Sequence, residues 1–163
     1  MSSDFNKDAL LRSAKRINVS YFKEQQEDAI NAIWQWWQSQ FISFTLSGYA
    51  GTGKTFIMRH LIRYLIVEKV CVTAPTHKAL RVLENSSGKK GMTIQSLCGL
   101  RPDVDIEDYN IENPSFKVIG EQKMRGYRLV IIDECSMINP GLFNLLIKTA
   151  IQCRCKLLFL GEM

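Results

Sequence analysis

The residues best suited to chemistry stand together in SGYAGTGKTF, residues 47–56, directly after the apolar run FISFTL. The pattern G-x-x-x-x-G-K-T, which begins at Gly48, is typical of a loop that binds phosphate between a strand and a helix. Its glycines let successive N–H groups point inward, and the following helix adds its positive N-terminal end. Lys54 is expected to reach the β and γ phosphates, and the Thr55 hydroxyl to bind Mg²⁺. The predicted nucleotide-binding residues of this loop are Gly48, Ala50, Gly51, Thr52, Gly53, Lys54 and Thr55.

Two carboxylates directly follow a second apolar run, LVIIDE, which ends in Asp133 and Glu134. Open α/β sheets bind their ligands at the C-terminal ends of their strands. Asp133 is therefore predicted to hold Mg²⁺, mostly through a bound water, and Glu134 to orient the water that attacks the γ phosphate. Glu134 and Lys54 are the predicted catalytic residues. In the alternative interpretation, the two acids merely cap the turn after the strand.

Apolar runs that alternate with helical patterns must position these groups. Each predicted strand is a continuous apolar run, which is typical of a parallel sheet covered on both sides. The predicted class is therefore α/β, with three layers. Strands are predicted at 41–48, 69–75, 127–134 and 155–161. Helices are predicted at 4–17, 23–39, 54–67, 76–85, 93–100 and 140–151. In the second of these helices, the stripe expected to face the core is Ala29, Ile30, Ile33, Trp34 and Trp37.

The composition of the 163 residues sets wider limits. A net charge of +5 fits a nucleic-acid binder but also fits many ordinary proteins. Five cysteines, an odd number at irregular spacing, argue against a disulfide framework. The start lacks an apolar signal core, and no stretch reaches 18 apolar residues. We expect no membrane association and a cytoplasmic location, or a nuclear one if the source has a nucleus; secretion is not expected.

The order of these motifs resembles the first RecA-like domain of superfamily 1 helicases of the B type, the RecD and Dda-like DNA helicases. The resemblance runs from about residue 20 to the last residue. It rests on YFKEQQEDAI (Q motif), GYAGTGKT (motif I), TAPTHKAL (motif Ia), TIQSL, IIDECSM (motif II) and LFLGEM (the opening of motif III). The chain departs from the family at Gln95, where histidine is usual, and at Glu162, where aspartate is usual.

The resemblance implies a P-loop motor domain that hydrolyses ATP with Mg²⁺ and steps along single-stranded DNA. Gln26 of the Q motif would read the adenine edge. DNA contacts are implied for Pro75, Thr76, His77, Lys78, Thr93 and Gln95. The residues themselves support part of this, since Thr76 and Lys78 follow the end of a strand and can bond phosphates. Thr76 as a helix N-cap and Lys78 as a solvated charge remain the structural alternative.

The resemblance also implies a domain organisation. Residues 1–19 are expected to form a helical extension, and residues 20–163 a RecA-like domain that is incomplete after the motif III strand. The polar span 101–126 stands where the family inserts its small 1B element, which separates DNA strands; the alternative is a solvated loop between core elements. Strand 155–161 is expected to lie between the strands of motif I and motif II. The second RecA-like domain, which supplies an arginine to the γ phosphate in the family, is missing, so we expect weak activity.

Two other classes of protein fit the same residues. One is a different P-loop ATPase, such as an AAA+-like module or a P-loop kinase, although a kinase would not need Glu134 to prepare a water. The other is a nucleotide-binding or DNA-binding module without turnover. The effect of Glu134→Gln on hydrolysis distinguishes an enzyme from a module that only binds.

Overall fold

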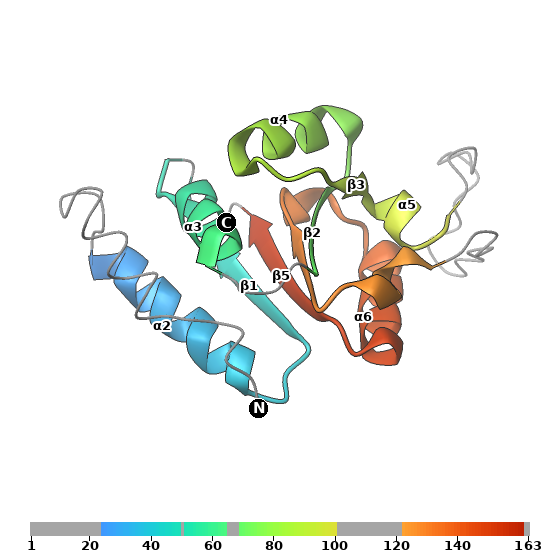
Figure 1. The fold of residues 1–163 in the computed structure, drawn as a ribbon, viewed down its shortest axis with the longest axis horizontal. Coiled ribbons are helices and arrows are strands. Elements are labelled where there is room, and N and C mark those ends of the chain that lie inside the picture. The colour runs from blue at the N-terminus through green and yellow to red at the C-terminus, as the bar shows by residue number, and fades with distance from the viewer. Residues whose placement is uncertain (1–23, 50, 65–68, 101–121, 162–163) are drawn as a thin grey trace.

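In the computed structural model, which describes residues 24–49, 51–64, 69–100 and 122–161, five parallel strands form one sheet in the order β1-β5-β4-β2-β3 (Figure 1). The strands are β1 (Ser43–Ser47), β2 (Val70–Ala74), β3 (Met92–Thr93), β4 (Leu129–Ile132) and β5 (Lys156–Gly161). Neighbouring strands pair in parallel throughout. The predicted parallel α/β sheet is therefore confirmed. The predicted position of strand 155–161 is also confirmed, because β5 lies between β1 and β4.

Helices cover both faces of the sheet, so the fold has three layers. Buried residues on one face come from α2 (Glu24–Gln38), α3 (Lys54–Tyr64) and α4 (His77–Ser87). On the other face they come from α5 (Ile94–Leu97), the short 3-10 helix η3 (Lys123–Gly126) and α6 (Pro140–Cys153). Each segment between consecutive strands returns the chain to the same end of the sheet, as parallel pairing requires.

The apolar runs become central strands because both of their faces are buried. In β4, Leu129 and Ile131 join the cluster under α2, α3 and α4. Val130 and Ile132 alternate with them and join the opposite cluster. Side chains of a strand alternate between the two faces of a sheet, so a strand covered on both sides is apolar at every position. β1, at the edge, is only partly buried.

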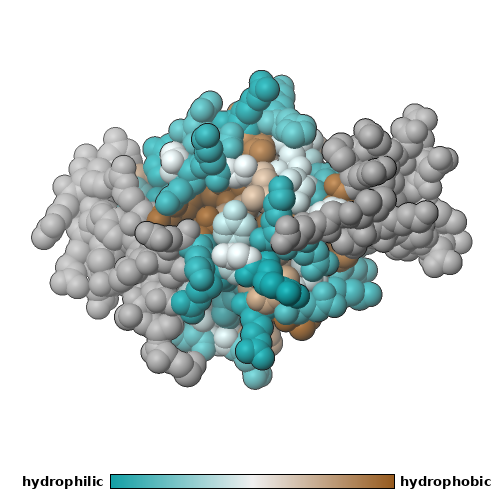
Figure 2. Space-filling view, turned by 45° about the vertical axis from the view of Figure 1, so that its right-hand side comes forward, coloured by the Kyte–Doolittle hydropathy of each residue, from teal (hydrophilic) through white to brown (hydrophobic). Residues whose placement is uncertain are grey.

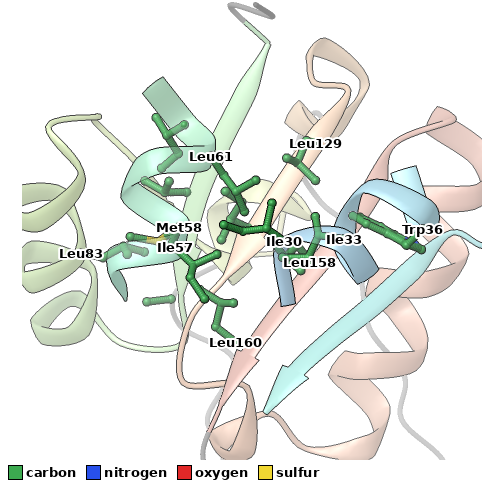
Figure 3. Packing of buried hydrophobic residues seen from close by; sticks show 14 of the residues in the cluster. Ile30, Ile33, Trp36, Ile57, Met58, Leu61, Leu83, Leu129, Leu158 and Leu160 are labelled. Atoms are coloured by element: carbon green, nitrogen blue, oxygen red, sulfur yellow. The ribbon is translucent and has the colours of Figure 1, made fainter. Parts of the chain in front are cut away.

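One cluster of buried hydrophobic residues packs α2, α3 and α4 against one face of the sheet (Figure 3). Ile30 and Ile33 of α2 are buried there, as predicted. Trp34 and Trp37 are partly buried and pack against this cluster, as the predicted stripe implies, but the stripe omitted Trp36, which is the more deeply buried tryptophan. Trp36 packs at 5.7 Å from the Phe44 ring and at 6.3 Å, edge-on, from the Trp37 ring.

Lys156, the first residue of β5, ties the end of α2 to the sheet. Its ammonium donates hydrogen bonds to the carbonyls of Trp36 at 3.0 Å, Ser39 at 2.8 Å and Phe41 at 2.9 Å. It also lies 5.0 Å from the centre of the Trp36 ring. Burial lowers the pKa of Lys156. The ammonium nevertheless adds a charged donor to carbonyls at and beyond the end of α2, of which the Trp36 carbonyl also accepts from the Ser39 N–H and hydroxyl.

Replacing Lys156 by methionine is expected to destabilise the fold by about 2 kcal/mol. Methionine keeps the packing on Trp36 but leaves three carbonyls without their charged donor, and hydrogen bonds to charged groups contribute roughly 1.5–3 kcal/mol. Urea unfolding measures the change, with Lys148→Met on the exposed face of α6 as the control. Equal stability of the two variants would contradict this role.

The short strand β3 was not predicted. The predicted helix 93–100 is reduced to Ile94–Leu97, and Met92 and Thr93 pair with β2 instead. Gly91 permits this close approach, because a Cβ there would collide with the Val72 carbonyl oxygen and the Leu80 side chain. The Gly91 N–H also donates to a Glu84 carboxylate oxygen at 2.8 Å. A strand of two residues is too short to show a hydrophobic pattern from which it could be predicted.

Gly91→Ala is expected to destabilise the protein by about 1–3 kcal/mol, the usual range for overpacking a filled site. The nearest obstacle is backbone, which cannot move aside as a side chain can. Thermal unfolding measures the loss. Gly126→Ala serves as the matched control, since a Cβ at Gly126 meets nothing within 4 Å. A Gly91→Ala variant as stable as this control would show that the approach of β3 to β2 is not tight.

Several predictions concern residues outside the described ranges. These are the helix at 4–17, the extension 1–19 and most of the proposed insertion, residues 101–121. The end of that span is described and belongs to the core: η3 buries Met124 among residues of α5 and α6. The part of 101–126 that could form a separate element therefore ends before η3.

Hydrophilic side chains cover most of the described surface on the face drawn in Figure 2, with hydrophobic residues showing between them. Within the described ranges, the helices are too short or too polar to cross a bilayer. All five cysteines are free.

Candidate functional site

Apart from Gln26, the residues predicted to bind the nucleotide and its metal follow the C-terminal ends of strands, and parallel pairing brings these ends to one edge of the sheet. The loop of motif I follows β1, and Asp133 and Glu134 follow β4. Ile132 pairs with Phe159, and Phe159 pairs with Thr45, so Asp133 stands at about the level of Leu46 in β1. With β5 between them, β1 and β4 are about 10 Å apart, two strand spacings. The loop and the two acids therefore lie at the same edge of the sheet, on either side of the end of β5.

The loop between β1 and α3 has the backbone shape that the glycine pattern predicts. Gly51 and Gly53 adopt positive φ values of 79° and 93°, which other residues rarely adopt. A Cβ on Gly53 would overlap the side-chain amide of Gln26. The Ile57 N–H donates to the Gly53 carbonyl at 2.9 Å, so the helix starts directly from the loop. Ala50 lies outside the described residues.

Lys54 folds back over this loop. Its ammonium donates to the carbonyls of Gly48 and, at 2.8 Å, Tyr49. The Tyr49 carbonyl also accepts from the Thr52 hydroxyl at 2.9 Å. The role of Tyr49 was not predicted, because a main-chain acceptor leaves no signature in the residue type. The ammonium is thereby held at the loop by bonds that a phosphate oxygen could replace.

Gln26, the predicted adenine reader, contacts the phosphate-binding loop itself. Its amide nitrogen donates to the Thr52 carbonyl at 3.0 Å, and its buried Oε1 has no hydrogen-bond partner. The contact joins α2 to the loop and accounts for the tight fit at Gly53. The family resemblance implies that Gln26 contacts the nucleotide, and it did not indicate this bond.

The two acids differ in their surroundings. The Asp133 N–H continues the ladder by donating to the Thr73 carbonyl at 3.0 Å. One Asp133 carboxylate oxygen accepts the Glu134 N–H at 2.9 Å. The alternative interpretation, in which the acids cap a turn, is therefore met in part by Asp133. Glu134 is exposed and makes no side-chain cap to the 3-10 helix η4 (Cys135–Met137).

Glu134 has a left-handed backbone, with φ 53° and ψ 41°. A residue with a side chain adopts this conformation at a cost of about 1–2 kcal/mol, and such strain often accompanies functional sites. Burial raises the pKa of the thiol of the next residue, Cys135. The strained turn directs the chain away from the sheet immediately after the acid pair.

The oxygen groups at this edge fit a magnesium ion. Mg²⁺ is usually held by one or two protein oxygens together with phosphates and waters, rather than by a full protein cage. Thr55, at the start of α3, and Asp133, after β4, supply a hydroxyl and a carboxylate at the same edge. Among the described residues, no group of three or more His, Cys, Asp or Glu side chains could hold a metal. The donor set therefore suits Mg²⁺ bound with a nucleotide better than a permanent metal centre.

The residues predicted to contact DNA lie at and after the ends of β2 and β3, farther along the same edge. Thr76, His77 and Lys78 are exposed, and Pro75 is partly buried. The Thr76 hydroxyl accepts from the Ala79 N–H at 3.1 Å, so it caps α4 as the structural alternative holds.

Thr93 and Gln95 have less access to solvent than the start of α4. Thr93 is buried, and its hydroxyl caps α5 by accepting from the Ser96 N–H at 3.3 Å. Gln95 is partly buried. The exposed predicted residues are thus concentrated at the first turn of α4.

Comparison with known proteins shows which family has this sequence and fold. The family model described as an AAA domain matches residues 26–163. The chain belongs to this family. Among its relatives is the ATP-dependent DNA helicase Dda of enterobacteria phage T4, which is 32% identical over 142 residues, 85% of this chain and 31% of that protein. The Pif1 helicase of a Psychrobacter strain is 28% identical over 100 residues, 61% of this chain and 15% of that protein.

Comparison with solved structures leads to the same type of protein. The Pif1 helicase from Candida albicans aligns with a TM-score of 0.59 and 26% identity, over 86% of this chain and 32% of that one. The AAA domain of this chain is therefore a RecA-like domain of the superfamily 1 B type, and the resemblance inferred from the motifs is confirmed. The chain spans about a third or less of the length of the relatives it matches.

Proposed function

We propose that this chain is the ATP-hydrolysing part of a DNA helicase, which binds Mg-ATP and single-stranded DNA and cleaves the β–γ phosphate bond. The supporting observation is the sheet order, in which β5 separates the lysine-bearing loop after β1 from the acid pair after β4. The relatives named as ATP-dependent DNA helicases support the same activity.

The proposed roles follow from the position of each group. The loop amides and Lys54 bind the β and γ phosphates, and Lys54 exchanges its bonds to loop carbonyls for bonds to phosphate oxygens. Thr55 and Asp133 would hold Mg²⁺, which when bound neutralises charge on the phosphates. Glu134 orients and polarises a water for in-line attack on the γ phosphate. Gln26, in the first turn of α2 next to the loop, would recognise the adenine.

We further propose that DNA lies along the first turn of α4, beside the acids. The supporting observations are the exposure of Thr76, His77 and Lys78 and their position at the same sheet edge. Backbone phosphates bind lysine without regard to base sequence. Free cysteines and ATP dependence agree with a cytoplasmic or nuclear protein.

An ATPase assay with and without single-stranded DNA tests the proposal. The expected result is slow, measurable hydrolysis, because an arginine supplied by a second domain contributes roughly 10³- to 10⁵-fold in other phosphoryl-transfer systems. Strong DNA-stimulated turnover by these 163 residues would contradict the expected dependence on a second domain. Absence of any hydrolysis under single-turnover conditions would favour the module that only binds.

DNA binding is tested separately with a fluorescent oligothymidylate. Lys78→Ala is expected to weaken binding and to reduce its salt dependence, since each phosphate contact contributes to the salt slope. Lys148→Ala removes an exposed lysine of α6 and is the matched control. Equal affinity of the two variants would remove α4 from the proposed DNA path.

A further inference from the structure

Gly161, the last residue of β5, joins the phosphate-binding loop to the segment that carries Glu134. On one side, its carbonyl accepts the Gly48 N–H at 3.3 Å, and it pairs with Ser47 at the end of β1. On the other side lies Cys135, which directly follows Glu134: a Cβ added to Gly161 would be only 2.5 Å from the Cys135 sulfur. Gly161 is buried, so these contacts fill the space around it.

We propose that Gly161 is a positioning residue that sets the separation between the phosphate-binding loop and the carboxylate of Glu134. The inference rests on the proposed ATP hydrolysis, because that reaction requires the water held by Glu134 to line up with a phosphate held by the loop. The position suits a glycine because β5 lies between β1 and β4, and its last residue contacts both the start of the loop after β1 and Cys135 in η4, which follows β4.

The turn after Glu134 links the backbone of Cys135 to that of Glu134. The Met137 N–H donates to the Glu134 carbonyl at 3.0 Å, and the Ile138 N–H donates to the Cys135 carbonyl at 3.1 Å. Glu134 already has a left-handed backbone, which leaves it little freedom to absorb a shift. A displacement of the Cys135 backbone is therefore expected to move Glu134 as well, whereas rotation of the Cys135 side chain alone would leave Glu134 in place.

The constraint at Gly161 is steric and comes from one atom. Gly161 is not among the glycines with positive φ, so alanine can adopt its backbone conformation. After the Cys135 sulfur, the nearest atoms to an added Cβ are two backbone nitrogens, of Ser136 at 3.7 Å and of Cys135 at 3.8 Å, which are ordinary contacts. Removing the sulfur should thus make room for the methyl group.

The test measures two quantities on the full chain: the single-turnover rate of ATP hydrolysis and the affinity for a fluorescent ATP analogue. Gly161→Ala is expected to lower the rate by roughly 10- to 100-fold, because a misplacement of about 1 Å can cost 10²-fold in rate. Affinity is expected to stay within about threefold, since the loop keeps its own phosphate-binding groups. A general loss of structure would reduce both quantities together.

Rescue by a second substitution distinguishes positioning from damage. Gly161→Ala combined with Cys135→Ala is expected to return to the rate of Cys135→Ala alone, because the colliding sulfur is gone. Cys135→Leu crowds the same space from the other side and should lower the rate while keeping affinity, which keeps the test decisive if Gly161→Ala does not fold. Gly126→Ala, with open space around it, is the control.

Three outcomes would overturn the inference: a Gly161→Ala rate equal to that of the wild-type chain, an equal loss of rate and affinity, or no rescue by Cys135→Ala. Failure of the proposed function gives a different result. In that case the wild-type chain itself would show no hydrolysis, and the positioning role would fall with it.

Discussion

Glu134→Gln should lower the rate of ATP hydrolysis by about 10²-fold or more while nucleotide affinity stays nearly unchanged, since a positioned general base typically contributes 10²- to 10⁴-fold. Glutamine keeps the size and hydrogen-bonding reach of the side chain but cannot polarise a water with a negative charge. The side chain is exposed and does not cap η4, so its replacement should leave the fold intact. Single-turnover hydrolysis and retention of bound ATP on a filter measure the two quantities.

The control for this variant is Glu24→Gln, which removes an exposed carboxylate from the first turn of α2. The control should hydrolyse ATP at the wild-type rate. If Glu134→Gln also hydrolyses at that rate, the water-orienting role is wrong. If neither protein turns over ATP but both bind it, the chain acts as a binding module.

Lys54→Ala should instead remove nucleotide binding itself. The ammonium is the charged donor at the loop, and a hydrogen bond from a charged group contributes roughly 1.5–3 kcal/mol. The expected loss of affinity for Mg-ATP is therefore about 10- to 100-fold, with hydrolysis falling at least as far. Titration with a fluorescent ATP analogue measures the affinity, and thermal unfolding checks the fold.

Arg59→Ala is the matched control, because Arg59 is an exposed cation on the same helix, α3. It should bind ATP like the wild-type chain. Wild-type affinity in Lys54→Ala would show that the ammonium serves only the loop carbonyls of Gly48 and Tyr49. The two substitutions together separate binding from turnover, since Lys54 is expected to govern the first and Glu134 the second.

Local sequence patterns were sufficient to predict most of the elements around the site. The apolar runs at 69–75, 127–134 and 155–161 became β2, β4 and β5, and Pro140 begins α6, where Asn139 caps the helix by accepting the Leu142 N–H at 2.8 Å. These signals are local: continuous hydrophobicity, helix caps and the glycine pattern depend on neighbouring residues. The motif order additionally indicated that β5 lies between β1 and β4.

Predictions failed where a contact between distant segments decided the outcome. Trp36, which the predicted stripe omitted, is buried because α2 presents it to Phe44 and to Lys156, a residue 120 positions away. β3 exists because Gly91 can approach Val72. The spacing of hydrophobic residues in a helix, or a strand of two residues, does not indicate such contacts, because the contacting residue lies elsewhere in the chain.

The sequence by itself determined which groups could perform the chemistry: the glycine loop with Lys54 and Thr55, and the acid pair Asp133 and Glu134. Residue type and spacing suffice for this, because phosphate and magnesium require particular amides, cations and oxygens. Only the tertiary structure decided how these groups are held. The bond from Gln26 to the loop, the left-handed backbone of Glu134 and the contact of Gly161 with Cys135 arise from packing between separate strands and helices, which the order of residues does not specify.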